Sequence, residues 1–139
     1  MKQVSLLIIK PFAFRNKKVG RIISMIEDGG FDILGMKELN LTKRLAERFY
    51  EIHSNKSFFD GLTTFMSSDK IVAICVEKDN CIEDLRKLVG NTDPRKAEVG
   101  TIRHEVGTDI EANGVHASDS EENARNEIRF FFSALEVLF

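Results

Sequence analysis

The sequence predicts an α/β (α+β) sandwich, in which helices cover a four-stranded antiparallel sheet. Short apolar runs typical of buried strands alternate along the chain with segments whose apolar residues recur at helical spacing. The chain has 139 residues, of which 42% are hydrophobic and 30% charged, and this fits a soluble domain with one core. We therefore expect a single domain over residues 1–139.

Four segments are predicted to be strands. The runs Leu6–Ile9 and Ile71–Val76 are apolar throughout, as expected for strands buried on both faces. Residues 31–41 form the second strand, and Val115-His116 is a short fourth strand or strand end. Lys10-Pro11 ends the first strand, because proline cannot donate a hydrogen bond to a central ladder.

Five segments are predicted to be helices. In the first, Val19, Ile22, Ile23 and Ile26 have the spacing of an amphipathic helix, which Gly29-Gly30 ends. The other four show similar periodicity: one capped by Thr42 that contains Leu45, Ala46 and Phe49; a short one with Phe58, Phe59, Leu62, Phe65 and Met66; one capped by Asp79 or Asn80 and closed by Gly90; and one with Ala124, Ile128, Phe131 and Phe132.

The remaining segments show little periodicity and are predicted to be irregular. They are residues 12–18, residues 53–57, residues 91–113 and a short tail from residue 135 to 139. A loop of about two dozen residues, such as 91–113, is uncommon in a compact domain unless it is functional. Without the extra helices, the order of elements is the β-α-β-β-α-β order of ferredoxin-like folds.

Residues 113–120 place a histidine between a short apolar segment and a dense helix-start signal. Ser118 and Glu121 have the Ser-x-x-Glu spacing of a capping box, and Ser120 is a second possible cap. Backbone N–H groups at a helix start favour anions, so His116 has a setting that suits phosphate chemistry. A single histidine near a helix start is nevertheless more often structural or exposed.

Composition and missing motifs exclude several classes of function. The net charge is −2 with no Lys/Arg tract, which argues against a dedicated nucleic-acid partner. No stretch approaches the roughly 20 apolar residues of a membrane span, and the start is not typical of a signal peptide, so we expect a cytoplasmic protein. Cys75 and Cys81 fit neither a zinc nor a redox spacing. Gly30 and Gly35 have P-loop spacing, but Met36 follows in place of Lys-Ser/Thr.

The pattern Asn113-x-x-His116-x-Ser118-Asp119-Ser120 resembles the active-site signature of nucleoside diphosphate kinases. Further marks of that family occur in its order over residues 3–132: Lys10-Pro11, Tyr50 before Phe58-Phe59 with Leu62, Arg86 six residues before Thr92 in Gly90-Asn91-Thr92-Asp93-Pro94, Gly100-Thr101-Ile102-Arg103, and Glu127 eleven residues after His116. Each residue alone has an ordinary structural explanation, and their conjunction makes the resemblance specific.

The resemblance implies a nucleoside diphosphate kinase. Its expected reaction is ping-pong transfer of a γ-phosphoryl group from a nucleoside triphosphate to a diphosphate, through a phosphohistidine at His116. Glu127 and Ser118 are expected to orient the imidazole, and Lys10 is expected near the transferred phosphate beside Tyr50. Mg²⁺ is the implied cofactor, held by the nucleotide phosphates with no direct protein ligand.

The resemblance also implies how a nucleotide binds. Arg86, Thr92 and Arg103 are expected to bind the phosphates, while Lys10 and Asn113 bind the sugar hydroxyls.

At the base, Phe58 is expected to stack on one face beside Leu62, with Ile110 on the other face. A π-face and an apolar wall contact no base edge, which implies broad base specificity. The expected partners are ATP, GTP, GDP and their deoxy forms, and further copies of the chain in a tetramer or hexamer.

Three positions depart from the family pattern. Phe12-Ala13 and His104-Glu105 replace the usual Asp-Gly and Gly-Asp, and Ala117 replaces the glycine after the histidine. A methyl group at Ala117 would make a positive φ or a close approach to phosphate harder.

Two alternatives to an active kinase are open, and the departures at Phe12 and Ala117 motivate the first of them. One is a nucleotide-binding regulatory protein that kept the fold, and the other is an unrelated ferredoxin-like binding domain. His53 and His104 match no catalytic position, and we predict that both lie on the surface.

Overall fold

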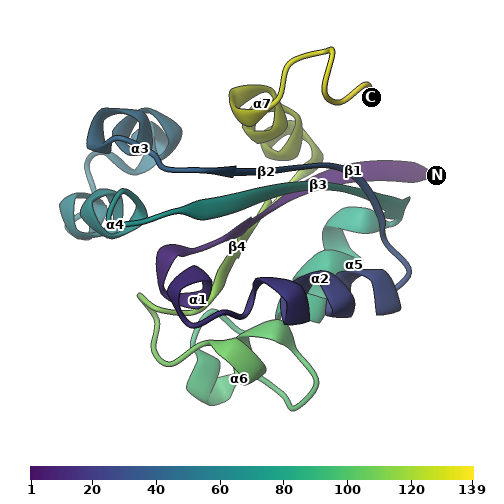
Figure 1. The fold of residues 1–139 in the computed structure, drawn as a ribbon, viewed down its shortest axis with the longest axis horizontal. Coiled ribbons are helices and arrows are strands. Elements are labelled where there is room, and N and C mark those ends of the chain that lie inside the picture. Colours follow the sequence, from purple (N-terminus) through teal and green to yellow (C-terminus); the bar gives the residue numbers. More distant parts are fainter.

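The computed structural model describes residues 1–139 and has a four-stranded sheet at its centre (Figure 1). The strands are β1 (Lys2–Ile9), β2 (Asp32–Leu39), β3 (Ile71–Asp79) and β4 (Val115–Ala117), and they lie in the order β2-β3-β1-β4. All three neighbouring pairs are antiparallel. This architecture confirms the predicted antiparallel α+β fold.

The register of the sheet places the candidate histidine against the first strand. Ile8 of β1 is paired with His116 of β4 on one side and with Ala73 of β3 on the other. β1 and β3 are the two central strands, and helices cover both of their faces. This double coverage explains why both strands are continuous apolar runs.

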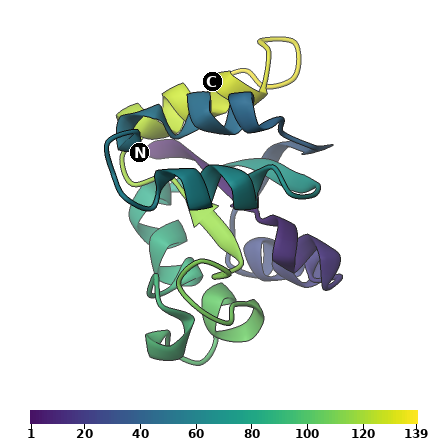
Figure 2. The same cartoon turned by 90° about the vertical axis from the view of Figure 1, so that its left-hand side faces the viewer.

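Seven helices pack on the two faces of the sheet. They are α1 (Pro11–Arg15), α2 (Val19–Asp28), α3 (Lys43–Phe49), α4 (Phe59–Met66), α5 (Cys81–Val89), α6 (Ile102–Val106) and α7 (Glu121–Phe131), with 3₁₀ turns at Glu51–His53 and Pro94–Lys96. In Figures 1 and 2, α1, α2, α5 and α6 lie on one side of the sheet, and α3, α4 and α7 lie on the other. No helix is long and apolar enough to cross a membrane.

Each face of the sheet has its own hydrophobic core. Leu7, Ile9 and Ile74 point into the core beneath α2 and α5. Their chain neighbours Leu6 and Ile8 point into the other core, beneath α3, α4 and α7. The alternation follows from the two-residue side-chain period of a strand.

Three helices begin at predicted cap residues, although one of these residues makes no side-chain hydrogen bond to the helix. Thr42 Oγ1 accepts a hydrogen bond from Leu45 N at 3.1 Å, and Ser120 Oγ accepts one from Asn123 N at 3.1 Å. Asn80 is the N-cap residue of α5 and has the left-handed conformation, with φ 56°. Its side chain, however, accepts no hydrogen bond from the first turn of the helix. Asp79, the alternative cap, is the last residue of β3.

The predicted irregular segments 12–18 and 91–113 both contain short helices, so those predictions were partly wrong. Pro11 is the first residue of α1, where its fixed φ suits a helix and its missing N–H costs nothing. Thr101 caps α6 by accepting a hydrogen bond from His104 N at 3.3 Å. Helices of five residues are too short to show periodicity in the sequence.

The ends of two other elements also differ from the prediction. β2 begins at Asp32 and ends at Leu39, so it is shorter than residues 31–41. α7 ends at Phe131, and Phe132 is extended. The tail that follows is packed on β2, since a Cβ added to Gly35 would lie 2.6 Å from Val137 Cγ2.

Candidate active site

One cavity, with a volume of about 750 Å³, collects most of the predicted site residues. Its wall comes from the end of β1, from the α3–α4 region, from α5, from the loop before β4 and from α7. The predicted residues that line it are Lys10, Tyr50, Phe58, Leu62, Arg86, Thr92, Arg103, Ile110, Asn113, His116 and Glu127. Only Ser118 lies behind this wall, and it contacts Glu127 from there.

A histidine, a glutamate and a serine form a hydrogen-bonded chain at the wall. His116 Nε2 lies 2.8 Å from Glu127 Oε1, and Ser118 Oγ donates to the same oxygen at 2.7 Å. His116 and Glu127 are half-buried, so the carboxylate has little water to compete with. Nδ1 of His116 makes no hydrogen bond within the protein.

Ser118 is anchored to the central sheet and is not a helix cap. It is fully buried, and its Oγ accepts a hydrogen bond from Leu6 N at 3.2 Å. The capping-box prediction for Ser118 and Glu121 was therefore wrong, because α7 starts two residues later, at the cap Ser120. The serine instead ties Glu127 to β1.

Lys10 and Asn113 are held together beneath the cavity. Lys10 Nζ donates to Asn113 Oδ1 at 2.8 Å, and Asn113 Nδ2 donates to Thr92 O at 3.1 Å. Burial, and secondarily the charge of Arg103, lower the pKa of Lys10 to about 7. An anion in the cavity would favour the charged form of this lysine.

Arg103 is fixed by backbone carbonyls. Nη1 donates to Gly90 O at 3.1 Å and Nη2 donates to Val115 O at 2.9 Å, while Nε is buried without a partner. Burial and the nearby Arg86 charge lower the pKa of Arg103 to about 10. With Lys10, three cationic side chains converge on a cavity wall that can bind an anion with several charges.

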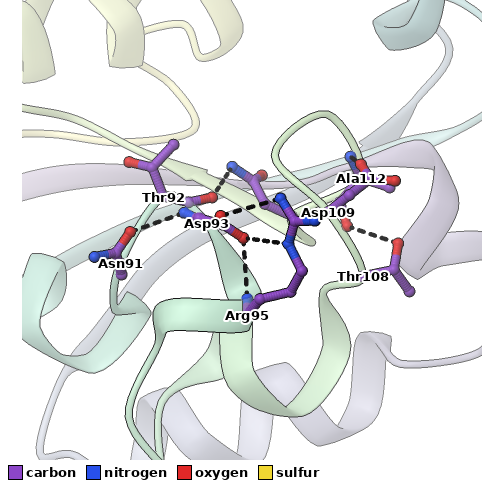
Figure 3. Close-up of polar contacts among 8 residues, drawn as sticks. Asn91, Thr92, Asp93, Arg95, Thr108, Asp109 and Ala112 are labelled. Atoms are coloured by element: carbon purple, nitrogen blue, oxygen red, sulfur yellow. Dashed lines mark hydrogen bonds and ion pairs between the residues drawn. The ribbon is translucent and has the colours of Figure 1, made fainter.

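The turn that carries Thr92 is held by its own side chains (Figure 3). Asn91 Oδ1 accepts a hydrogen bond from Asp93 N at 2.9 Å, and the Asp93 carboxylate accepts from Arg95 N and Nε at 3.1 and 3.0 Å. These bonds, with the Arg95 charge, keep the pKa of Asp93 below its usual value. Thr92 is exposed at the tip of this turn and faces the cavity.

The opposite end of the cavity is apolar. Phe58 and Ile110 both line it and are 53% and 56% exposed, although they are large hydrophobic side chains. Leu62, one turn into α4, lies beside them in the same wall. Exposed apolar walls of this kind suit a flat aromatic ligand.

Tyr50 lines the cavity next to His116, with ring centroids 6.1 Å apart, and its hydroxyl is buried and unpartnered. Burial, with a smaller contribution from Glu127, raises its pKa, so the phenol stays neutral and can donate a hydrogen bond. A buried hydroxyl without a partner is unusual in a native protein. Its position at the cavity wall provides a place for an acceptor on a ligand.

The two remaining histidines differ from each other. His53 was predicted at the surface, but it is half-buried, lines the cavity and has its ring centroid 5.7 Å from that of Phe58. His104 is exposed, as predicted, and its Nδ1 lies 3.1 Å from Ala97 O. No signal in the sequence separates the two, because cavity lining depends on how α4 packs.

Ala117 introduces no strain beside the histidine. It is the last residue of β4 and pairs with Leu7, and its φ is not positive. A positive φ at this position, one of the two difficulties expected for its methyl group, is therefore absent. The position that requires glycine is Gly114, three residues earlier. Its φ is +89°, and a Cβ there would lie 2.6 Å from Val106 Cγ2.

Several residues that line the cavity were not among the predicted site residues. They are Phe49, Ile52, Ser57, Gly61, Glu111, Asp119 and Asn123, in addition to His53 and Ala117. Asn123 Nδ2 donates to Asp119 Oδ1 at 2.6 Å, one turn into α7. Ala117 and Asp119 stand inside the motif of residues 113–120, and the others are placed by packing.

Comparison with known proteins agrees with this geometry. The nucleoside diphosphate kinase family model matches residues 3–137. The chain belongs to the nucleoside diphosphate kinase family. It is a phosphotransferase with nucleoside diphosphate kinase function, and the alternative of an unrelated ferredoxin-like domain was wrong.

Individual members of the family match over almost their whole length. The chain is 48% identical over 131 residues to the nucleoside diphosphate kinase of Geobacter sp. (strain M21), covering 94% of this chain and 96% of that protein. For the kinase of Helicobacter pylori (strain Shi470), identity is 47% over 137 residues, covering 99% and 100%.

Solved structures of the family have the same fold. The nucleoside diphosphate kinase of Aquifex aeolicus superposes with a TM-score of 0.96 at 38% identity, over 99% of this chain and 100% of that one. That of Halobacterium salinarum, in complex with CDP, has a TM-score of 0.94 at 31% identity, over 100% and 93%.

Proposed function

We propose that His116 carries the phosphoryl group in a ping-pong reaction between nucleotides. The observation that carries the proposal is the 2.8 Å contact between His116 Nε2 and Glu127 at the wall of a cationic cavity. A carboxylate on Nε2 favours the tautomer with its proton there, which leaves the lone pair on Nδ1. Nδ1 is then the nucleophile.

Each half-reaction forms one bond and breaks one. In the first, Nδ1 attacks the γ-phosphorus of a nucleoside triphosphate, and the bond to the β-phosphate oxygen breaks with its electron pair on the departing diphosphate. In the second, a terminal oxygen of another diphosphate attacks the same phosphorus, and the electron pair of the P–N bond returns to His116. Glu127 stabilises the charge that the imidazole gains as its Nδ1 is phosphorylated.

The cationic residues take the phosphate contacts in this proposal. Arg86, Arg103 and Thr92 bind the phosphate chain, and Lys10 lies near the transferred group beside the Tyr50 hydroxyl. Asn113, which already orients Lys10, shares the sugar hydroxyls with it.

The base lies between Phe58 and Ile110, next to Leu62. Neither wall offers a donor or an acceptor to a base edge, so purines and pyrimidines are accepted alike. CDP is present in the Halobacterium salinarum structure, and we extend that binding to this chain, to ATP, GTP, GDP and their deoxy forms.

Mg²⁺ is expected to enter with the nucleotide. The nucleotide phosphates would hold the ion with no direct protein ligand, and phosphate oxygens are donors that suit Mg²⁺. No three His, Cys, Asp or Glu side chains lie together so as to hold a metal ion. When bound, the ion supplies further neutralisation of phosphate charge.

We also propose a homo-oligomer, a tetramer or a hexamer, that acts in the cytoplasm, where nucleotides are plentiful. β2 is an edge strand of eight residues with unpaired backbone groups on one side, and its Met36 is 51% exposed. Such an edge is typically covered by another chain or protected by charge. Analytical ultracentrifugation gives the number of copies, and a monomer at micromolar concentration would contradict this part.

The phosphohistidine is tested by brief incubation with γ-labelled ATP and Mg²⁺. We expect a protein-bound label that survives alkali, is lost in acid and is discharged by GDP, and no label in His116→Ala. A His116→Ala variant that transfers phosphate at the normal rate would refute the mechanism. If the wild type binds nucleotide but takes no label, the cavity binds nucleotides without forming a phosphohistidine, as the regulatory alternative expects.

A further inference from the structure

The aromatic side chain of Phe49 lies at the meeting point of three elements. It is the last residue of α3 and is half-buried at the cavity wall. Its ring meets His116 of β4 edge to face, with centroids 5.6 Å apart and an interplanar angle of 75°. It is therefore in direct contact with the imidazole that the mechanism uses.

Phe49 also contacts the helix that carries the partner of His116. Its ring centroid is 5.3 Å from Phe130 and 5.2 Å from Phe131. These residues follow Glu127 by three and four positions on α7, so they lie on the same side of the helix as the carboxylate. One ring thus packs both against His116 and against the helix that carries Glu127.

Hydrogen bonding alone leaves the imidazole free to rotate. The contact to Glu127 fixes Nε2, but a ring held at one atom can still swing about that contact. Edge-to-face packing restricts this motion, because the partner's ring edge must stay over the face. Tyr50 adds a second such contact, with centroids 6.1 Å apart.

We propose that Phe49 is a positioning residue for phosphoryl transfer, which holds His116 and helix α7 at the separation that the His116–Glu127 hydrogen bond requires. The inference rests on the proposed role of His116. Its effect is on the geometry of Nδ1 and not on nucleotide binding, because the predicted phosphate, sugar and base contacts come from other residues.

The test is the variant Phe49→Leu, which removes the ring and keeps an apolar side chain. We expect kcat to fall about tenfold, the factor that corresponds to the loss of one or two such contacts, while KM for nucleotides changes less than about twofold. Phe65→Leu is the matched control, because Phe65 is half-buried against the same core but does not line the cavity. It should keep the wild-type kcat.

Nitrogen NMR of the imidazoles gives a second measurement, the tautomer of His116. A change in packing elsewhere in the core does not alter this quantity. The chain has three histidines, so His116 is assigned by comparison with His116→Ala. We expect the wild type to show one dominant tautomer with the proton on Nε2, and Phe49→Leu to show a mixture. Phe49→Met replaces the leucine variant if that variant does not fold.

The possible failures are distinguishable. A wild-type kcat and an unchanged tautomer in Phe49→Leu would overturn this inference, as would an equal loss in Phe65→Leu. Phosphoryl labelling that persists in His116→Ala would instead overturn the proposed function.

Discussion

At the scale of single residues, Glu127 combines two hydrogen-bond contacts with a negative charge, which a neutral side chain lacks. Its Oε1 accepts from Ser118 and faces Nε2 of His116. In the proposed mechanism its negative charge offsets the positive charge that develops on the imidazole, and the buried Ser118 holds it in position. We therefore expect the rate of phosphoryl transfer to depend on both the charge and the position of Glu127.

Glu127→Gln should lower kcat by about 10- to 100-fold, because the amide keeps the shape but loses the charge and favours no single tautomer of His116. Steady-state kinetics with ATP and GDP measures the change. Glu122→Gln, an exposed position on the same helix, is the control and should be neutral. A kcat within twofold of the wild type in Glu127→Gln would contradict the assigned role.

Lys10 should make nucleotide binding dependent on pH. Its pKa of about 7 leaves it mostly neutral above that pH in the free protein, and nucleotide phosphates raise the pKa again. Binding at pH 8 should therefore take up close to one proton, and affinity should fall as pH rises above 7.

Calorimetry in buffers of different ionisation enthalpy measures this uptake. Lys10→Met should abolish it, while Lys70→Met, at an exposed position on no cavity wall, should leave it intact. Uptake that is unchanged in Lys10→Met would assign the proton to another group.

At the scale of elements, the site is assembled where β1, β4 and the loop before β4 meet α5 and α7. In the segment after α5, the backbone as well as the side chains shapes the site. Gly90 has φ +89°, a Cβ there would lie 2.7 Å from Thr101, and its carbonyl accepts from Arg103. The same residue ends a helix and holds Arg103, which is proposed to bind phosphate.

Gly90→Ala should lower the free energy of unfolding by about 1–3 kcal/mol, because the left-handed conformation and the contact with Thr101 both oppose a methyl group. Nucleotide affinity should fall as well, because the backbone carbonyl of residue 90, which fixes Arg103, would shift. Urea denaturation measures the first effect.

Gly20→Ala is the matched control. Gly20 is inside α2 with open space around it, so alanine should stabilise the protein by about 0.5–1 kcal/mol. If Gly90→Ala were as stable as the wild type, the backbone argument would be wrong.

At the scale of the whole molecule, the cavity links the two sides of the sheet. Phe49, Tyr50 and Leu62 come from the layer of α3 and α4, while Arg86 and Arg103 come from the layer of α5 and α6. A ligand that contacts both layers binds only the folded chain. Nucleotides should consequently stabilise the fold as a unit.

ADP, GDP and CDP, each at about 100 times its Kd, should each raise the free energy of unfolding by about 2.7 kcal/mol. Phe58→Ala should reduce the stabilisation at a given concentration for all three nucleotides alike. Phe139→Ala, which removes a partly exposed ring outside the cavity, should not. A loss confined to one base would mean that Phe58 does not form the stacking wall.

The antiparallel α+β fold and the longer helices were predictable from the chain alone, because buried strands leave apolar runs and amphipathic helices leave periodic apolar patterns. The family was predictable from the resemblance of its motifs and their order. The order of Lys10, Arg86, Arg103 and His116 along the chain was also enough to predict that they would line one site. α1 and α6 were not predictable, since five residues hold little more than one helical turn.

Tertiary structure alone decided the roles that depend on contacts between distant segments. Ser118 reads locally as a cap, and only the family resemblance placed it beside Glu127. Its bonds to Leu6 and Glu127 form because β4 pairs with β1 and α7 starts later. His53 and Phe49 reach the cavity through the packing of α3 and α4. Local sequence determines which residues can form a helix or a cap, whereas packing across the sheet determines which of them meet.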